Sequence, residues 1–195
     1  MIRLPKNGLL YHGSYVEIKD IDLGKCQNGL DFGKGFYLTS SMEQAISFIP
    51  SSVRKAKLRK IVPNDFPVAE GRISCYKYQP NPNLFIHCFN EANEEWLHFV
   101  ASNRRSDLFQ ELRNKYSAVD IIGGKIANDQ TALTLNNYIA GTFGTPGTER
   151  ADRMAIDLLK ANRLKDQFCF RSEEAIASLK FMWSQNHGTY KSKHL

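Results

Sequence analysis

Two short runs of strand-forming residues, each bounded by glycine, constrain the fold of this chain most strongly. The first run, residues 9–12, ends at His12 and leads into Gly13, and an irregular loop separates it from the second run, residues 35–39. Glycine lets a backbone approach a flat ligand closely, while the neighbouring His12 and Tyr37 supply a hydrogen bond and a stacking face. We therefore expect two strand ends that together hold a flat, polar ligand.

The remaining elements follow one another in no regular order. Ser40 and Glu43 form a capping-box pattern, after which apolar residues recur at helical spacing, so a helix is predicted to begin just after the second run. Further strands are predicted at 68–78, 84–89, 119–122 and 168–170, and further helices at 94–104, 151–164 and 172–181. Strands scattered between helices of unequal length predict an α+β fold rather than a doubly wound sheet.

Length and composition predict one domain. A chain of 195 residues with 42% hydrophobic content can bury a single sizeable core. We expect this domain to span residues 1–183 and to be followed by a frayed, polar and basic tail at 184–195. The glycine-rich segment 141–147 lacks the lysine and serine of a phosphate-binding loop, so a flexible connector is predicted there.

Charge and residue usage narrow the partners and the location. The N-terminus lacks the apolar core of a signal peptide and no apolar run is long enough to span a bilayer, so a cytoplasmic protein without a membrane partner is expected. The formal net charge of +6 favours acidic ligands or nucleic acid. The four cysteines form no close pair and the histidines show no ligand spacing, so free thiols and no metal are predicted.

Three separated segments resemble one known donor site. His12-Gly13-Ser14, the run around Tyr37, and the aromatic Phe48 on the following helix resemble the site of the ADP-ribosyltransferase superfamily, in its His-Tyr-Glu branch. This resemblance implies a split β-sheet core of the ADP-ribosyltransferase type. Residues 95–96, 103–104, 120–123 and 128–129 look like those of an uncharacterised bacterial family of this superfamily, found near toxin and defence genes.

The resemblance implies NAD as the donor substrate and assigns roles to individual residues. His12 would donate a hydrogen bond to a ribose hydroxyl while the backbone of Gly13 pairs with the carboxamide. Tyr37 and Phe48 would enclose the nicotinamide ring, and Ser14 would add a polar contact. Taken singly, each of these residues has an ordinary structural interpretation in a strand, core or helix.

The third catalytic position departs from the pattern of the branch. Gln167, at the start of the run 167–172, stands where the resemblance implies glutamate. A neutral amide keeps a hydrogen bond to the ribose but loses the negative charge, which favours transfer of a single ADP-ribose over polymer formation. Glu95 and Asp129 are the alternative acidic residues, and Asp129 is also the candidate base for the acceptor.

These observations predict a glycosyltransferase: an NAD-dependent mono-ADP-ribosyltransferase that acts as a toxin or phage-defence effector. Its acceptor would be a host macromolecule, either RNA or DNA or a protein, and an antitoxin is a possible partner. One alternative is a module that binds or hydrolyses NAD with little transferase activity. Another is a basic nucleic-acid-binding domain in which His12 and Tyr37 are only core residues, although the basic run at 54–60 is most simply a solvated helix face.

Overall fold

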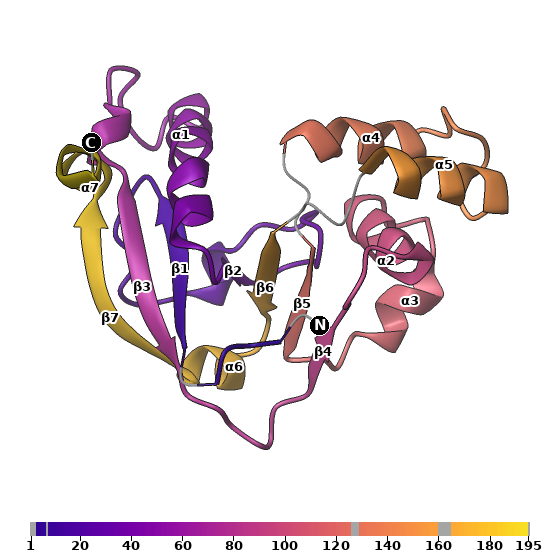
Figure 1. Cartoon of the computed structure of the whole chain (residues 1–195), viewed down its shortest axis with the longest axis horizontal. Helices are drawn as coiled ribbons and strands as arrows, with labels where there is room; N and C mark the ends of the chain where they lie inside the picture. The colour runs from indigo at the N-terminus through magenta and orange to yellow at the C-terminus, as the bar shows by residue number, and fades with distance from the viewer. Residues whose placement is uncertain (1–2, 7, 126–128, 160–164, 195) are drawn as a thin grey trace.

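The computed structural model describes residues 3–6, 8–125, 129–159 and 165–194, and within them the strands form two sheets (Figure 1). One sheet has three antiparallel strands in the order β1-β3-β7, and the other has four strands in the order β2-β6-β5-β4, of which only β4 and β5 are parallel. The strands are β1 (Leu9–Ser14), β2 (Phe36–Leu38), β3 (Arg72–Tyr78), β4 (Ile86–Cys88), β5 (Ile121–Lys125), β6 (Asp166–Phe170) and β7 (Leu179–Asn186). The predicted α+β class is confirmed.

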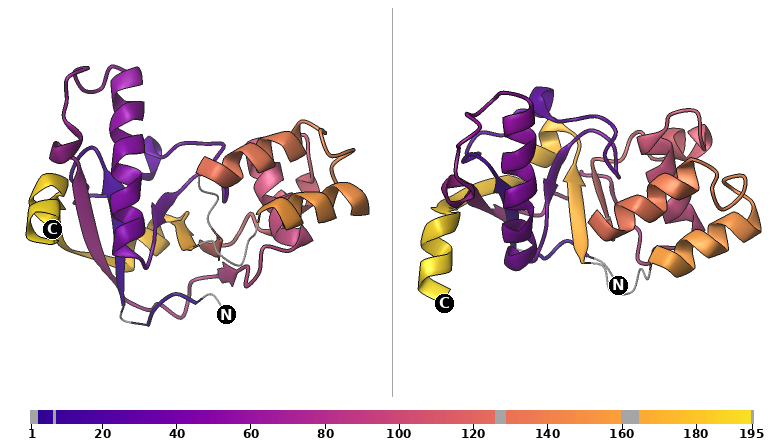
Figure 2. Two further views of the ribbon diagram at one scale, coloured as in Figure 1. Left: turned by 45° about the horizontal axis from the view of Figure 1, so that its top comes forward. Right: turned by 90° about the horizontal axis from the view of Figure 1, so that it is seen from above.

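The helices separate into two groups. α1 (Met42–Leu58) stands over the three-stranded sheet, with α7 (His187–His194) beside it, and α6 (Glu173–Ala177) joins β6 to β7 (Figure 1). The other group lies against the four-stranded sheet and stays together at one end of the molecule in the turned views (Figure 2). It consists of α2 (Glu94–Arg104), α3 (Gln110–Lys115), α4 (Asp129–Ile139) and α5 (Glu149–Leu159). Two short 3-10 turns occur at η1 (Leu23–Lys25) and η2 (Val68–Glu70).

Within the described ranges, one backbone bridge joins the two sheets. The N–H of Tyr11 donates to the carbonyl of Thr39 at 2.8 Å, and the N–H of Thr39 donates back to the carbonyl of Tyr11 at 3.0 Å. Both hydrogen bonds lie at the end of β2, where the chain is about to enter α1. The bridge therefore fixes the position of β1 relative to β2 and the start of the helix.

The alternation of side chains along the strands divides the core into two layers. On one face, α1 covers the three-stranded sheet through contacts such as Ile49 with Ile73, and the α2–α5 group covers the four-stranded sheet around Ile122. On the other face, Leu10 and Phe168 belong to a cluster that extends under both sheets. The two sheets thus share one buried layer on one face. On the opposite face, a separate group of helices covers each sheet.

The helix after the second strand is capped one residue later than predicted. Ser41, not Ser40, has the extended backbone of a cap, and its hydroxyl accepts from the N–H of Gln44 at 3.3 Å. The helix then continues to Leu58 and includes most of the basic run, whose side chains lie largely on its exposed side. The prediction of a strand followed directly by a helix is confirmed.

The predicted final helix is wrong beyond Ala177. Leu179, Phe181 and Trp183 alternate with more exposed residues along β7, which pairs with β3. Such a period of two is typical of a half-buried strand, and the open edge of β3 supplies the backbone partners that a helix would not need. The ring of Phe181 packs edge-on against Tyr76, with centroids 5.9 Å apart.

The predicted frayed tail is also not what the structure contains. β7 runs through residue 184 to Asn186, and α7 follows it and packs against η2. The N–H of His187 donates to the carbonyl of Gly71 at 2.8 Å, and the His187 side chain is buried. The end of the domain is therefore set by pairing with β3 rather than by the change to polar composition.

Several other boundaries differ from the predictions. Residues 68–70 form a 3-10 turn before β3, β5 continues through Gly123 and Gly124, and α3 and α4 lie where no helix was predicted. Of the predicted helix at 151–164, residues 160–164 lie outside the described part of the chain. No helix among the described residues is long and apolar enough to cross a membrane. All four cysteines are free thiols.

A buried polar network ties the second helical group together. Asp152 on α5 accepts from the hydroxyl of Tyr138 on α4 at 2.5 Å and from the N–H of Gly147 at 3.1 Å. Its other oxygen lies 2.7 Å from Nε2 of His98 on α2, whose ring stacks on Phe109. One carboxylate thus links three helices and the turn before α5.

Replacing Asp152 with alanine is therefore expected to destabilise the protein. The change leaves the buried hydroxyl of Tyr138 without its acceptor and the ring of His98 without its partner, so the free energy of unfolding should fall by on the order of 3 kcal/mol in urea denaturation. Asp157→Ala, on the exposed side of the same helix, is the matched control and should change it by less than about 0.5 kcal/mol. Equal effects of the two substitutions would contradict the structural role of the network.

Candidate functional site

Among the described residues, backbone pairing between β1 and β2 stops at the Tyr11–Thr39 bridge, and we call the region between the unpaired parts of these two strands the gap. Because Tyr11 directs its N–H and C=O at Thr39, Gly13 two residues later turns its own N–H and C=O to the same side, away from β3. Tyr37, two residues before Thr39, faces β1 for the same reason. A continued ladder would pair Gly13 with Tyr37, but the bridges found among the described residues stop at Tyr11 and Thr39.

His12 lies at this junction, and its side chain forms a hydrogen bond with the backbone carbonyl of Tyr37, the group that a continued ladder would have paired with Gly13. Its Nδ1 lies 2.8 Å from the backbone oxygen of Tyr37. A carbonyl can only accept, so Nδ1 carries the proton and Nε2 of the neutral ring is an acceptor. Burial lowers the pKa of His12, an effect that the hydrogen bond to Tyr37 partly opposes. The sequence predicted that His12 would donate to a ligand hydroxyl, whereas this geometry makes it accept.

The hydroxyl of Tyr37 is held by the backbone of the loop before β2. The hydroxyl donates to the carbonyl of Gly33 at 2.7 Å and accepts from the N–H of Phe32 at 2.9 Å. Burial, and then the neighbouring Cys169 and Asp31, raise the pKa of Tyr37 well above its ordinary value, so the hydroxyl stays protonated. The ring stacks on Phe32 with centroids 6.5 Å apart. Only the ring of Tyr37, and not its hydroxyl, is left for a ligand.

Gly13 is required by the packing of α1 against β1. A Cβ at this position would lie 1.8 Å from the carbonyl oxygen of Ala45 on α1. No side chain fits there unless the helix moves away from β1. The glycine therefore lets α1 lie directly on the strand, and this contact places the first two turns of the helix beside the gap.

The structure brings Ser14 and Phe48 near this region in different ways. Ser14 is buried at the end of β1, opposite Arg72 of β3. Phe48 lies one turn after Ala45 on α1 and is 37% exposed. Among the ring pairs of the described residues, Phe48 is not paired with Tyr37. Enclosure of a ligand ring between the two stays a prediction.

Gln167 lies on β6 and shares a sheet face with Tyr37. Tyr37 pairs with Cys169, and Gln167 is two residues from Cys169, so the side chains of all three project from the same side. Gln167 is buried, and its Nε2 donates to Oδ2 of Asp31. Asp31 is thus a site residue to which the sequence analysis gave no role, because no local signal links positions so distant along the chain.

Of the two acidic alternatives, only Glu95 has a described side chain, and it is directed elsewhere. Glu95 on α2 accepts from Nζ of Lys115 at 2.6 Å and from the hydroxyl of Tyr116 at 2.7 Å, and these hydrogen bonds lower its pKa. It therefore links α2 to α3. Asp129 begins α4, but its side chain lies outside the described residues.

One further polar group near the gap was not predicted. Gln44, in the first turn of α1, is buried and accepts from the hydroxyl of Thr39 at 3.2 Å through its Oε1. Its Nε2 has no hydrogen-bond partner in the described part of the chain. A buried amide with one open end next to the sheet junction is available to a ligand that enters there.

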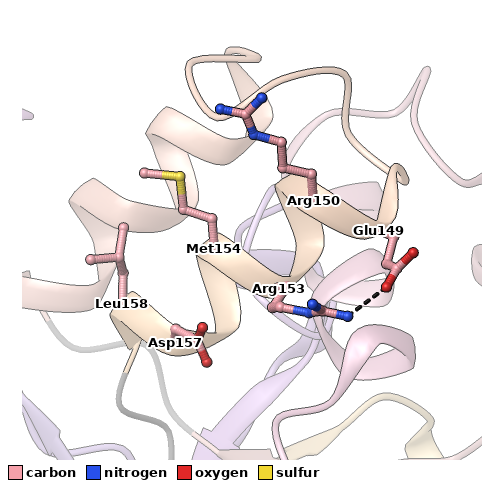
Figure 3. Close-up of a pocket in the computed structure, with 6 residues that line it drawn as sticks. All are labelled: Glu149, Arg150, Arg153, Met154, Asp157 and Leu158. Atoms are coloured by element: carbon pink, nitrogen blue, oxygen red, sulfur yellow. Dashed lines mark hydrogen bonds and ion pairs between the residues drawn. The ribbon is translucent and has the colours of Figure 1, made fainter.

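The outer surface of α5 carries a separate, shallow hollow (Figure 3). It is lined by residues of this helix alone: Glu149, Arg150, Arg153, Met154, Asp157 and Leu158. None of the predicted site residues borders it. Among the described residues, no group of three histidine, cysteine or acidic side chains is arranged to hold a metal ion.

The comparisons with known proteins give one match. A family model described as "Protein of unknown function (DUF3990)" matches residues 9–181, which includes both glycine-bounded strands, α1 and Gln167. No curated protein and no solved structure matches the chain. The site must therefore be interpreted from its own geometry.

The ionisation of His12 tests that geometry directly. We expect its ring to be the Nδ1–H tautomer at pH 7 and to titrate below its ordinary pKa of 6.5, because burial disfavours the charged form. A group with a lowered folded-state pKa contributes stability that is lost as the pH falls through that pKa. Nitrogen-15 NMR of the imidazole across pH 4 to 8, assigned with His12→Asn, measures both properties. A midpoint at or above 6.5, or an Nε2–H tautomer, would contradict the assignment.

Proposed function

The chain belongs to the DUF3990 family, and from the geometry of the sheet gap we propose that it is an NAD-dependent mono-ADP-ribosyltransferase. The observation that carries this proposal is the open backbone edge of Gly13 beside the neutral ring of His12. The two-sheet arrangement, with β1 and β2 joined at one bridge, supports the split-sheet core that the resemblance implies.

A primary carboxamide is the chemical group that fits the edge at Gly13. The N–H and C=O of one strand residue can pair with the C=O and N–H₂ of a carboxamide, much as they pair with a neighbouring strand. The nicotinamide end of NAD carries such a group on a flat ring. The ring of Tyr37 on the adjacent strand and Phe48 on α1 are suited to stack against that heterocycle.

His12 contributes a hydrogen-bond acceptor rather than a charge. Its Nδ1–H is engaged by the Tyr37 carbonyl, so Nε2 can accept from a ribose hydroxyl of the donor. A neutral ring also avoids repulsion with the cationic nicotinamide. Both properties follow from the burial that lowers the pKa of His12.

The transfer is a substitution at the nicotinamide ribose. The bond between C1′ and the ring nitrogen breaks, its electron pair leaves with nicotinamide, and the acceptor forms a bond to C1′ and loses a proton. Because nicotinamide departs as a neutral molecule, no acid is needed to assist it. The chain's own residues hold the ribose and the ring in one conformation, with Gln167 as a further acceptor for a ribose hydroxyl.

The acceptor is proposed to be a macromolecule of a host cell, with the enzyme acting in the cytoplasm as a toxin or defence effector that an antitoxin could restrain. The formal net charge of +6 favours an acidic acceptor such as RNA or DNA, and a protein side chain is the other class. Without a carboxylate at position 167 to activate a ribose hydroxyl, transfer of one ADP-ribose is favoured over chain extension.

Incubation with labelled NAD and total cell extract tests the proposal. Free nicotinamide and label in macromolecules are measured, followed by nuclease or protease treatment of the product. Label that is lost with nuclease indicates a nucleic-acid acceptor, and label that is lost with protease indicates a protein. Nicotinamide without label indicates an NAD hydrolase. If neither forms and NAD does not raise the melting temperature, the proposal is wrong and a nucleic-acid-binding domain is favoured.

His12→Asn is expected to separate the two roles of the histidine. The asparagine Nδ2 can replace Nδ1 as the donor to Tyr37, but nothing replaces the acceptor Nε2. The melting temperature should therefore change little, while kcat/KM for nicotinamide release falls by at least about tenfold. Unchanged kcat/KM in the folded variant would exclude contact between Nε2 and the donor.

Phe48→Ala is expected to weaken NAD binding at least about fivefold, because stacking of a base on an aromatic side chain contributes about 1–3 kcal/mol. Phe48 is only partly buried, at 37% exposure, so the fold should persist. Phe85→Ala removes an even more exposed phenylalanine, at 70%, just before β4 and is the matched control. Calorimetric titration with NAD compares the two variants, and equal affinities would remove Phe48 from the site.

A further inference from the structure

A carboxylate stands beside Gln167 although position 167 itself is neutral. Oδ2 of Asp31 accepts a hydrogen bond from Nε2 of Gln167 at 3.4 Å, at the long end of hydrogen-bonding distance. Both residues are buried, with 8% and 6% of their surface exposed. Asp31 comes from the loop before β2 and Gln167 from β6, so the pair exists only in the folded chain.

α2 holds this carboxylate in place. Arg104 directs two nitrogens at Oδ1 of Asp31, Nε at 2.8 Å and the second guanidinium nitrogen at 2.7 Å. Asn103 donates its Nδ2 to the backbone oxygen of Asp31 at 3.2 Å. Arg104 thus pairs with the Oδ1 side of Asp31, while Oδ2 faces the glutamine.

Phe32, the residue after Asp31, packs the loop against β5 and β6. The ring of Phe32 occupies the space above Gly124, where an added Cβ would lie 2.6 Å from its Cζ atom. Gly124 pairs directly with Gln167 across β5 and β6. The hydroxyl of Tyr37 holds the next peptide of the loop through Phe32 and Gly33. Asp31 is therefore fixed over the pair formed by Gly124 and Gln167.

The chemistry of the contact orients the glutamine amide. An ionised carboxylate only accepts hydrogen bonds, so Gln167 must turn its NH₂ group towards Asp31 and its Oε1 the other way. The amide oxygen is then a fixed acceptor on the side that Asp31 does not occupy. Without Asp31, the amide would be free to present either end.

We propose that Asp31 is a positioning residue of the donor site: held by Arg104, it fixes the Gln167 amide so that Oε1 accepts from a ribose hydroxyl. This inference rests on the proposed transferase function. It also gives a physical reason for glutamine at position 167. A glutamate there would place a second carboxylate against that of Asp31, and two carboxylates in contact resist ionising fully.

Exchanging the carboxylate of Asp31 and the amide of Gln167 tests the proposal. The variants are Gln167→Glu, Asp31→Asn and the double variant. Gln79→Glu adds the same charge at an exposed position and is the matched control. Thermal unfolding without NAD is measured from pH 5 to 8, and kcat and KM for nicotinamide release are measured over the same range. Because Asp31→Asn alone leaves Arg104 without a carboxylate to balance its charge, whereas the double variant restores one carboxylate at position 167, the deciding comparison is between Gln167→Glu and the double variant.

In Gln167→Glu, the two carboxylates are expected to share a proton, with a raised pKa for the pair. A carboxyl group whose pKa is raised on folding gives stability at low pH that is lost as the pH rises through the raised pKa. The melting temperature of this variant should therefore fall between pH 5 and 8 relative to the control, and kcat at pH 8 should fall about tenfold. The double variant, with one carboxylate and one amide, should recover a flat pH profile and most of kcat.

Three results would overturn the proposal: a flat pH profile for Gln167→Glu, a kcat that rises on adding the glutamate, or a double variant that is worse than Gln167→Glu. Failure of the proposed function is distinguishable from these. If the unmodified protein neither releases nicotinamide nor is stabilised by NAD, the role of Asp31 in that reaction falls with it. The unfolding profiles without NAD still decide whether Asp31 faces position 167.

Discussion

The bridge between Tyr11 and Thr39 is the interaction on which the rest of the structure depends. Its two backbone hydrogen bonds are the point where the three-stranded and four-stranded sheets meet, directly before the cap of α1. Beyond this bridge β1 and β2 form no further backbone pair among the described residues, and the imidazole of His12 donates a hydrogen bond to the carbonyl of Tyr37. Beyond the bridge, the backbone of Gly13 is left facing the gap, and the proposed function places a ligand amide there.

The loop before β2, which carries Asp31 and Phe32, also shapes the candidate site. It is held by the hydroxyl of Tyr37, by Asn103 and Arg104 of α2, and by the ring of Phe32 above Gly124. A single hydrogen bond of this kind contributes only about 1 kcal/mol, but several that hold one short loop leave it little freedom. The loop therefore connects the helical group to the strand that carries Tyr37, and it places Asp31 beside Gln167.

Sequence patterns correctly predicted the elements that have a strong local signal. They were wrong for segments whose secondary structure depends on a partner distant in the chain. The helix at 94–104 and the strands around His12 and Tyr37 have clear periodicity or glycine boundaries, and they were placed correctly. The segment from Leu179 to Asn186 was assigned to a helix and a tail, because its period of two is short and only the open edge of β3 selects a strand. The cap moved from Ser40 to Ser41 because Thr39 is held in the bridge, which shifts the start of the helix.

The sequence by itself determined the α+β class and, through residue type and glycine spacing, the candidate residues His12, Gly13 and Tyr37, whereas Gln167 became a candidate only through the resemblance. Only the tertiary structure decided how these residues can act. Burial and the Tyr37 carbonyl make His12 a neutral acceptor. The fold also brings Asp31 and Arg104 to Gln167, and it directs Glu95 to Lys115 instead. Tautomer, amide orientation and charge pairing depend on groups far apart in the chain, so they are fixed by packing and not by sequence neighbours.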